Sequence, residues 1–158
     1  MRTDTRLSRM LHVLIHMDRH QQSATSDTLA QMLGTNPVVV RRTMALLKEQ
    51  GYVTSEKGHR GGWSLSKPLS QMTLLDIHQA LDSTSIFAIG LSTDHPQCLV
   101  EQAVNAVLTD AFDEAQALLL KRLGAITLAQ LAEDFDARFR QVYAEDGADL
   151  SQVGQIGH

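Results

Sequence analysis

Three glycines fall within five residues of one another in the segment EKGHRGGWSLSKP, which spans residues 56–68. Glycine permits sharp backbone turns and loses more conformational entropy on folding than other residues, so this cluster indicates that a tight turn is required. The alternating stretch YVTSE precedes the cluster and WSLS follows it, and both patterns are typical of strands. We therefore predict a β-hairpin in which Trp63 anchors the base of the turn in the core. The glycines of the turn are Gly58, Gly61 and Gly62.

Two short helices are predicted immediately before this hairpin. In SATSDTLAQMLG, Ser26 suits an N-cap and Gly34 suits the left-handed position after a helix. In TNPVVVRRTMALLKEQG, Asn36 suits an N-cap, Pro37 the first helical position and Gly51 the end. A tight turn between two such helices is typical of a helix-turn-helix, and a hairpin that directly follows one is a wing. An earlier helix, RLSRMLHVLIHMDRH, carries a wide apolar face.

Charge is divided unevenly between the two halves of the chain. The net charge is −4, yet residues 1–67 contain ten Lys and Arg against five Asp and Glu, and residues 68–158 contain four against thirteen. A basic region joined to an acidic one points to binding of an anion. In a helix-turn-helix the second helix enters the major groove, and a wing contacts phosphates or the minor groove. The pattern as a whole predicts binding to double-stranded DNA.

The expected DNA contacts come from both helices and from the tip of the wing. Arg41 and Arg42 lie near the start of the second helix, and Arg60 lies at the tip of the hairpin. Val38 and Val39 offer only an apolar contact, such as one to a thymine methyl group. A solvated helix face is the alternative for the arginine pair, and a generic surface turn is the alternative for the hairpin. The full predicted set is Ser26, Thr28, Thr35, Asn36, Pro37, Val38, Val39, Arg41, Arg42, Lys57, His59 and Arg60.

The segment LLKEQGYVTSEKGHRGGWSLSKPLSQMTLLDIHQAL resembles the winged-helix segment of the Rrf-two family of bacterial transcription regulators. The resemblance rests on the helix end at residues 47–51, the wing glycines followed by Trp63, and residues 73–77 at the start of the next helix. It implies a mostly α fold, with a winged helix-turn-helix domain and a long dimerisation helix. Cluster-binding members of the family carry three cysteines before the long helix, whereas the linker DSTSIFAIGLSTDHPQCLV holds Cys98 alone. We therefore expect no iron–sulfur cluster and no other cofactor.

The C-terminal half predicts a second copy of the chain as partner. Pro96 suits a first helical position, and QCLVEQAVNAVLTDAFDEAQALLLKRLG then predicts a helix of roughly 28 residues, or ~42 Å. A small domain cannot cover so long an apolar stripe, so the same helix of a second subunit is expected to do so in a twofold dimer. A further helix, ITLAQLAEDFDARF, begins with a capping box at Thr127 and should pack back through Leu128, Leu131 and Phe135. The expected dimer contacts are Leu99, Ala103, Val104, Val107, Leu108, Ala111, Phe112, Ala115, Leu118 and Leu119.

Two features allow more than one interpretation. His12, His16 and His20 recur every four residues, a spacing that suits zinc, but no nearby cysteine or acid completes such a site and a solvated face is the simpler interpretation. Cys98 is expected in the first turn of the long helix, where the helix dipole lowers a thiol pKa while Asp94 opposes that effect. A redox response through Cys98, an unidentified small-molecule signal and a plain thiol all remain open.

We predict three segments: a winged helix-turn-helix domain over 1–82, a linker with the long helix and a short C-terminal helix over 83–143, and a loose tail over 144–158. The chain has no run of 18 apolar residues, its N-terminus does not read as a signal peptide, and one cysteine excludes an internal disulfide, so the cytoplasm is the simplest compartment. The absence of a nucleophile elbow, a P-loop and a G-x-G-x-x-G motif argues against an enzyme. We predict a homodimeric, sequence-specific transcription regulator, a repressor, on a palindromic operator. The alternative is a winged-helix dimer that serves as a protein-interaction module.

Overall fold

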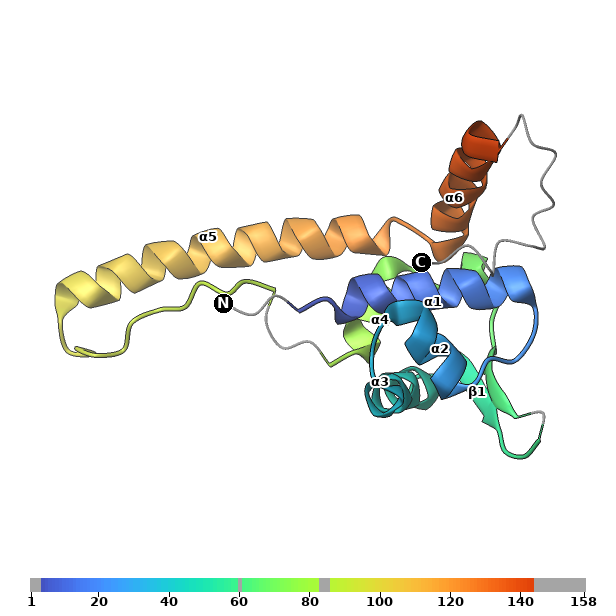
Figure 1. Cartoon of the computed structure of the whole chain (residues 1–158). Helices are drawn as coiled ribbons and strands as arrows, with labels where there is room; N and C mark the ends of the chain where they lie inside the picture. The colour runs from blue at the N-terminus through green and yellow to red at the C-terminus, as the bar shows by residue number, and fades with distance from the viewer. Residues whose placement is uncertain (1–3, 60, 83–85, 144–158) are drawn as a thin grey trace.

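The structure is a computed structural model, and it describes residues 4–59, 61–82 and 86–143. Over these residues the chain is mostly helical and contains a small two-stranded antiparallel sheet. A block built from the first four helices and the sheet carries a long helical arm, and the last helix follows the arm (Figure 1). The elements are α1 (Arg6–His20), α2 (Ser26–Leu33), α3 (Pro37–Glu49), β1 (Val53–Glu56), β2 (Gly62–Leu65), the 3-10 helix η1 (Leu69–Gln71), α4 (Leu74–Ala80), α5 (Leu99–Gly124) and α6 (Leu128–Tyr143).

The core of the block forms where α1, α3 and α4 meet. Leu14 of α1 and Ile77 of α4 are fully buried there. Val40, Met44 and Leu47 follow one another at helical spacing along α3, and all three are buried. Burial of each such side chain contributes ~1.5–3 kcal/mol, so this stripe fixes the rotation of α3 about its own axis. The opposite face of α3, which carries the polar and basic side chains, is thereby held outward.

The turn between α2 and α3 forms as the sequence predicts. Gly34 follows α2 in the left-handed conformation, with φ 60°. Asn36 caps α3, because its Oδ1 accepts a hydrogen bond from the backbone N–H of Val38 at 2.8 Å. Pro37 is the first residue of the helix, where its missing N–H is no loss. These local signals set the start of α3, the part of the helix that a helix-turn-helix presents to DNA.

The prediction that Ser26 caps α2 is wrong. Thr25 is the N-cap, and its Oγ1 accepts a hydrogen bond from the backbone N–H of Thr28 at 3.1 Å. Ser26 is the first helical residue, and its Oγ accepts a hydrogen bond from Nε1 of Trp63 at 2.9 Å. A partner that lies far along the chain thus decides which of two adjacent hydroxyl residues becomes the cap.

Linker residues 86–98 run outward from the block, and α5 returns alongside them as an arm whose C-terminal end meets the block (Figure 1). The helix has 26 residues and no buried side chain, and at ~1.5 Å per residue it is ~39 Å long. The linker touches it at two places: the rings of Phe87 and Phe112 lie 6.1 Å apart, and Nδ2 of Asn105 donates a hydrogen bond to the carbonyl of Ser92 at 2.8 Å.

The prediction that Pro96 opens this helix is also wrong. α5 begins at Leu99, and Cys98 is its N-cap rather than a residue of its first turn. The preceding residues form a turn in which the backbone N–H of Cys98 donates to the carbonyl of His95 at 2.9 Å. The carboxylate of Glu101 accepts a hydrogen bond from the backbone N–H of His95 at 3.1 Å. This contact with the first turn of α5 holds residues 95–98 outside the helix.

α6 returns to the block, as predicted, and continues to Tyr143. Its capping box is present: the backbone N–H of Thr127 donates to Oε1 of Gln130 at 2.9 Å, and the backbone N–H of Gln130 donates to Oγ1 of Thr127 at 3.2 Å. Leu128 is fully buried, and its backbone N–H donates to the carbonyl of Met72 at 2.8 Å. The junction between the arm and the block is therefore anchored. The predicted tail at 144–158 lies outside the described residues.

Candidate nucleic-acid interface

The start of α3 and the hairpin lie on the same side of the block. Figure 1 shows α3 and the β1–β2 hairpin facing away from α5 and α6. This is the arrangement in which a recognition helix and a wing meet one DNA duplex together. The sequence-predicted contacts at 35–42 and at Lys57 and His59 are thus carried by elements that share one face.

Two valines are exposed at the start of α3. Val38 is 54% and Val39 46% exposed, whereas Val40, the next residue, is buried in the core. Val38 and Val39 have no hydrogen-bonding group, so on a DNA surface they offer methyl groups to the thymine methyl of a base edge. Asn36 is exposed, and its capping contact uses only its side-chain oxygen, so its amide N–H groups stay available.

Arg41 and Arg42 follow the valines and are both exposed. In the part of the chain that the structure describes, neither guanidinium forms an ion pair; the pairs involve Arg6, Arg19 and Arg138. The helix N-terminus beside them adds a partial positive charge of its own. Two free guanidinium groups and a helix N-terminus on one exposed surface suit a phosphate or a guanine edge.

The predicted DNA contacts in α2 and in the turn are less accessible to DNA than those in α3. The hydroxyl of Ser26 is half-buried and bonded to Trp63. Thr28 is exposed, and its Oγ1 lies 2.9 Å from Oγ1 of Thr25. Thr35 is half-buried, and its backbone N–H donates to the carbonyl of Ala30 at 2.9 Å. Ser26 therefore joins α2 to the wing, while Thr28 stays on the surface.

The wing is a short antiparallel hairpin with Val53 opposite Leu65 and Glu56 opposite Gly62. Its base is tied to the connection between α1 and α2 by two hydrogen bonds between Ala24 and Trp63, at 2.8 Å and 3.0 Å. Trp63 is half-buried and packs against the core, as predicted. The wing is therefore attached to the helix-turn-helix through both the backbone and the indole side chain of Trp63.

Two glycines are required by close backbone approach. A Cβ on Gly61 would lie 2.3 Å from the carbonyl oxygen of Glu56, on the opposite strand. A Cβ on Gly62 would lie 2.9 Å from the backbone of Ala24. Gly58 turns the tip with φ 110°, and its carbonyl accepts a hydrogen bond from the backbone N–H of Gly61 at 3.0 Å. The glycine cluster thus makes a tight turn and lets β2 pack against the α1–α2 connection.

The basic residues of the tip are only partly within the described chain. Lys57 and His59 are exposed, on either side of Gly58. Arg60, the predicted minor-groove contact, lies outside the described residues. Nζ of Lys48 donates a hydrogen bond to Oγ of Ser55 at 2.7 Å, a contact between α3 and β1 that was not predicted from the sequence.

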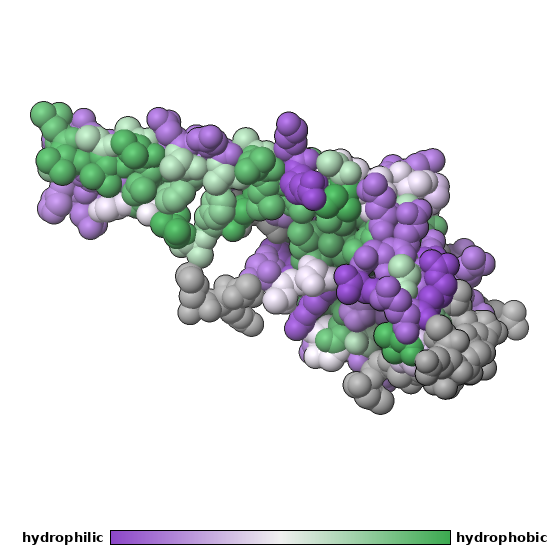
Figure 2. All heavy atoms as spheres, turned by 90° about the horizontal axis from the view of Figure 1, so that it is seen from above, coloured by the Kyte–Doolittle hydropathy of each residue, from purple (hydrophilic) through white to green (hydrophobic). Residues whose placement is uncertain are grey.

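The arm carries the apolar stripe that the sequence predicts for a partner. Val100, Val104, Val107 and Leu118, which follow one another at helical spacing, are 71%, 50%, 69% and 70% exposed. Figure 2, which looks down on the arm, shows hydrophobic side chains gathered along it and at its free end. Phe112 differs from the other predicted dimer contacts because the linker residue Phe87 already covers part of it.

Cys98 is exposed at the free end of the arm. Hydrogen bonds from the backbone N–H of Glu101, and then from that of Val100, lower the pKa of its thiol. This direction agrees with the prediction from the helix start.

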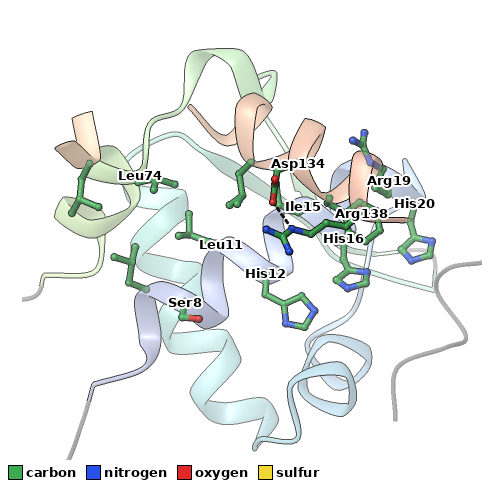
Figure 3. Close-up of a pocket in the computed structure, with 14 residues that line it drawn as sticks. Ser8, Leu11, His12, Ile15, His16, Arg19, His20, Leu74, Asp134 and Arg138 are labelled. Atoms are coloured by element: carbon green, nitrogen blue, oxygen red, sulfur yellow. Dashed lines mark hydrogen bonds and ion pairs between the residues drawn. The ribbon is translucent and has the colours of Figure 1, made fainter. Parts of the chain in front are cut away.

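The histidines of α1 lie beside one another, with His16 and His20 stacked and His12 tilted against His16 (Figure 3). Within the described residues, no group of three or more His, Cys, Asp or Glu is placed to hold a metal ion.

Among the helices that the structure describes, none is long and apolar enough to cross a membrane.

The family of this chain follows from comparison of its sequence with protein-family models and with known proteins. The model of the Rrf-two (Rrf2) family, described as an iron-dependent transcriptional regulator, matches residues 3–134. The chain belongs to the Rrf2 family. YwnA of Bacillus subtilis, named as an HTH-type transcriptional regulator, is 31% identical over 128 residues, which cover 79% of this chain and 92% of YwnA. These matches confirm the predicted class, a DNA-binding transcriptional regulator. The homologues are regulators and not enzymes, as predicted.

Solved structures show the same fold. A transcriptional regulator from Lactobacillus plantarum superposes with a TM-score of 0.73 at 25% identity, over 92% of this chain and 99% of that one. IscR of T. potens superposes with a TM-score of 0.58 at 19% identity, over 85% of this chain and 88% of IscR. The second likeness concerns the fold alone, and it confirms the mostly α, winged-helix architecture.

The iron of the family description does not fit the residues of this chain. Iron–sulfur clusters are held by several cysteine thiolates, in some cases together with histidine. The chain has a single cysteine, Cys98, and in the described ranges it stands on an exposed helix start without two further ligands beside it. We therefore derive no role for iron in this protein.

Proposed function

We propose that this chain represses transcription as a homodimer bound to a palindromic operator. The observation that carries the proposal is the exposed start of α3, where Arg41 and Arg42 have no acidic partner among the described residues. α3 would enter the major groove, with the arginines on phosphates or guanine edges and Val38 on a thymine methyl. The wing would follow the adjacent backbone or minor groove. Occupancy of the operator would exclude the polymerase.

The arm supports the dimeric form of the proposal. The stripe residues Val100, Val104, Val107 and Leu118 are about 50–71% exposed in the single chain. An exposed apolar surface of this kind is typical of an interface with a partner. Two copies of α5 that pair antiparallel about a twofold axis would cover both stripes with the same contacts. The two blocks would then lie at opposite ends of a helix pair ~39 Å long. The pairing would also fix the separation of the two α3 helices, and with it the spacing of the half-sites that they contact.

The experiment begins with selection of bound fragments from genomic DNA, followed by footprinting and fluorescence anisotropy on the selected operator. We expect a palindromic footprint whose half-sites lie one helical turn, or a multiple of it, apart. Arg41→Ala and Arg42→Ala should each weaken operator binding by ~1–3 kcal/mol if the side chain reads a base, and by less if it meets phosphate. Transcription in vitro from the selected promoter should fall when the protein is added.

The matched control is Arg140→Ala, which removes an exposed arginine from α6, on the side of the block away from α3. It should bind the operator as the wild type does. If Arg41→Ala and Arg42→Ala both kept the full preference for operator over random DNA, the assignment of α3 as the recognition helix would be wrong.

A further inference from the structure

The two strands of the wing cannot hold its tip in place by themselves. β1 and β2 have four residues each and form a two-stranded sheet. A hairpin of this size is marginally stable at best unless it packs against other elements. Lys57 and His59, at the tip, are exposed. The position of the tip therefore depends on the contacts that the strands make with the rest of the block.

One cross-strand pair of the hairpin is tied to both helices of the helix-turn-helix. Ser55 of β1 lies opposite Trp63 of β2, and the side chains of such a pair share one face of a hairpin. Oγ of Ser55 accepts a hydrogen bond from Nζ of Lys48, on α3, at 2.7 Å. Nε1 of Trp63 donates a hydrogen bond to Oγ of Ser26, the first residue of α2, at 2.9 Å. The angle between the wing and the two helices is thus set at this pair.

The bond between Trp63 and Ser26 is the stiffer of the two ties. Lys48 is exposed and its long side chain has many rotamers, so water competes for its contact with Ser55. Trp63 and Ser26 are both half-buried, and Ser26 is held by the helix that it begins. The N–H is the single hydrogen-bonding group of an indole, so loss of its acceptor is costly in a half-buried place.

The backbone of Trp63 supplies the pivot about which this bond acts. Its N–H donates to the carbonyl of Ala24 at 2.8 Å, and its carbonyl accepts from the N–H of Ala24 at 3.0 Å. Gly62, the next residue toward the tip, lies so close that a Cβ added there would be 2.9 Å from the backbone of Ala24. These contacts keep β2 from sliding, but two backbone hydrogen bonds leave the hairpin free to rotate about them. The bond from the indole to Ser26 stops that rotation.

We propose that Ser26 is a positioning residue for DNA binding, which acts through Trp63 and does not touch DNA itself. Its hydrogen bond to the indole fixes the angle of the wing, so that the tip and the start of α3 reach one duplex together. A wing that is already in place loses less entropy on binding than one that DNA must order. The inference rests on the proposed function, because it requires that the wing contacts DNA.

The bond itself is tested without DNA. Trp63 is the only tryptophan of the chain, so NMR spectra of the full chain labelled with nitrogen-15 show one indole N–H signal. We expect Ser26→Ala to speed the exchange of this hydrogen with solvent roughly tenfold, since its acceptor is gone. Ser8→Ala, the same change at an exposed position of α1, is the matched control and should leave the exchange rate unchanged. Equal exchange rates in Ser26→Ala and the wild type would overturn the inference.

Operator affinity is measured next, by fluorescence anisotropy on the selected operator. Ser26→Ala should weaken binding roughly three- to tenfold, and so should Trp63→Phe, which keeps an aromatic ring but removes the N–H. The two changes together should cost no more than the larger single loss, because both remove the same bond. Circular dichroism and thermal unfolding check that each variant is folded. Wild-type affinity in Ser26→Ala, or a combined loss equal to the product of the two single losses, would contradict the role of this bond.

Two chemical probes separate the wing from α3 on the DNA. The tip variant Lys57→Ala/His59→Ala/Arg60→Ala first defines the wing footprint, as the operator positions that it no longer protects from hydroxyl radicals. At saturating protein, Ser26→Ala should lose protection at these positions and keep the protection of guanine N7 from dimethyl sulfate in the major groove, where α3 would lie. Equal loss in both probes would mean that the change disturbs the whole block, and the positioning role would fall.

A last comparison distinguishes positioning from direct contact. In the tip variant the wing no longer holds DNA, so adding Ser26→Ala should not weaken operator binding further. A further loss as large as in the wild type would place Ser26 on the DNA and overturn the inference. A wild-type footprint identical to that of the tip variant would also overturn it, while operator recognition by α3 would stand. A chain that binds no operator would overturn the proposed function, and this inference with it.

Discussion

The block and the arm differ in how completely they bury their apolar side chains. In the block, Leu14, Met44 and Leu47 are fully buried, and the helices and the wing surround a shared core. In α5, no side chain is buried over 26 residues, and Val100 and Leu118 are about 70% exposed. The block therefore buries its own core within one chain. The apolar side chains of α5 stay exposed and need a second surface to cover them.

This difference separates two roles within one chain. The block can orient the start of α3 and the wing without help, because the core stripe of α3 and the ties from Trp63 to Ser26 and Ala24 lie within it. The arm can set the distance between two such blocks only when a second surface covers it. Stability of the fold should depend on the first region, and assembly on the second.

The largest expected effect is on the stability of the block. Leu47→Ala leaves a cavity in the core and should lower the free energy of unfolding by ~2–5 kcal/mol. Leu118→Ala, the same change on the arm, should lower it by less than ~0.5 kcal/mol in a dilute, dissociated sample, because the side chain is exposed there. Urea unfolding at low protein concentration measures both. Equal losses in the two variants would mean that the arm is part of the core.

The next effect is on DNA affinity. Arg60→Ala removes the predicted contact at the tip of the wing and should weaken specific binding by ~1–3 kcal/mol if Arg60 enters a narrow minor groove, and by less on phosphate. Arg140→Ala, on α6, should have no effect. Fluorescence anisotropy at matched salt compares them, and an unchanged dissociation constant for Arg60→Ala would remove the wing from the interface.

The smallest effect concerns the thiol at the end of the arm. The pKa of Cys98 is lowered by the backbone N–H groups of Glu101 and Val100, so its alkylation by iodoacetamide should reach half its maximal rate at a lower pH than that of free cysteine. Peroxide would convert this thiolate to a sulfenic acid and release water. We expect a change in DNA affinity after peroxide in the wild type and none in Cys98→Ser. The same response in both would show that Cys98 plays no part in sensing.

The features predicted correctly from sequence are those with local causes. The Asn36–Pro37 start of α3, the Gly34 turn and the Thr127 capping box depend on neighbours within a few residues. The glycines of the wing were also predicted, although the reason for Gly62 is its approach to Ala24, a residue far away in the chain.

The features that were predicted wrongly or not at all have causes that lie far away in the chain or outside the local pattern. Ser26 loses the cap position because its hydroxyl bonds the indole of Trp63, and Pro96 loses the helix start because Glu101 holds the backbone of His95. The apolar groove between α1, α4 and α6 (Figure 3) was not predicted at all. Its walls come from α1 and α6, which are more than a hundred residues apart, and the sequence shows the α1 histidines only as a polar stripe.

The most direct test of this division of roles is the mass of the chain in solution, measured by sedimentation equilibrium. We expect twice the 17.4 kDa of one chain for the wild type, at concentrations that saturate the operator. The double variant Val104→Asp/Val107→Asp places two charges on the exposed stripe of α5, so it should sediment as a single chain, keep the thermal unfolding of the block and lose cooperative operator binding. A wild-type chain that stays at 17.4 kDa while it occupies both half-sites would contradict assembly through α5.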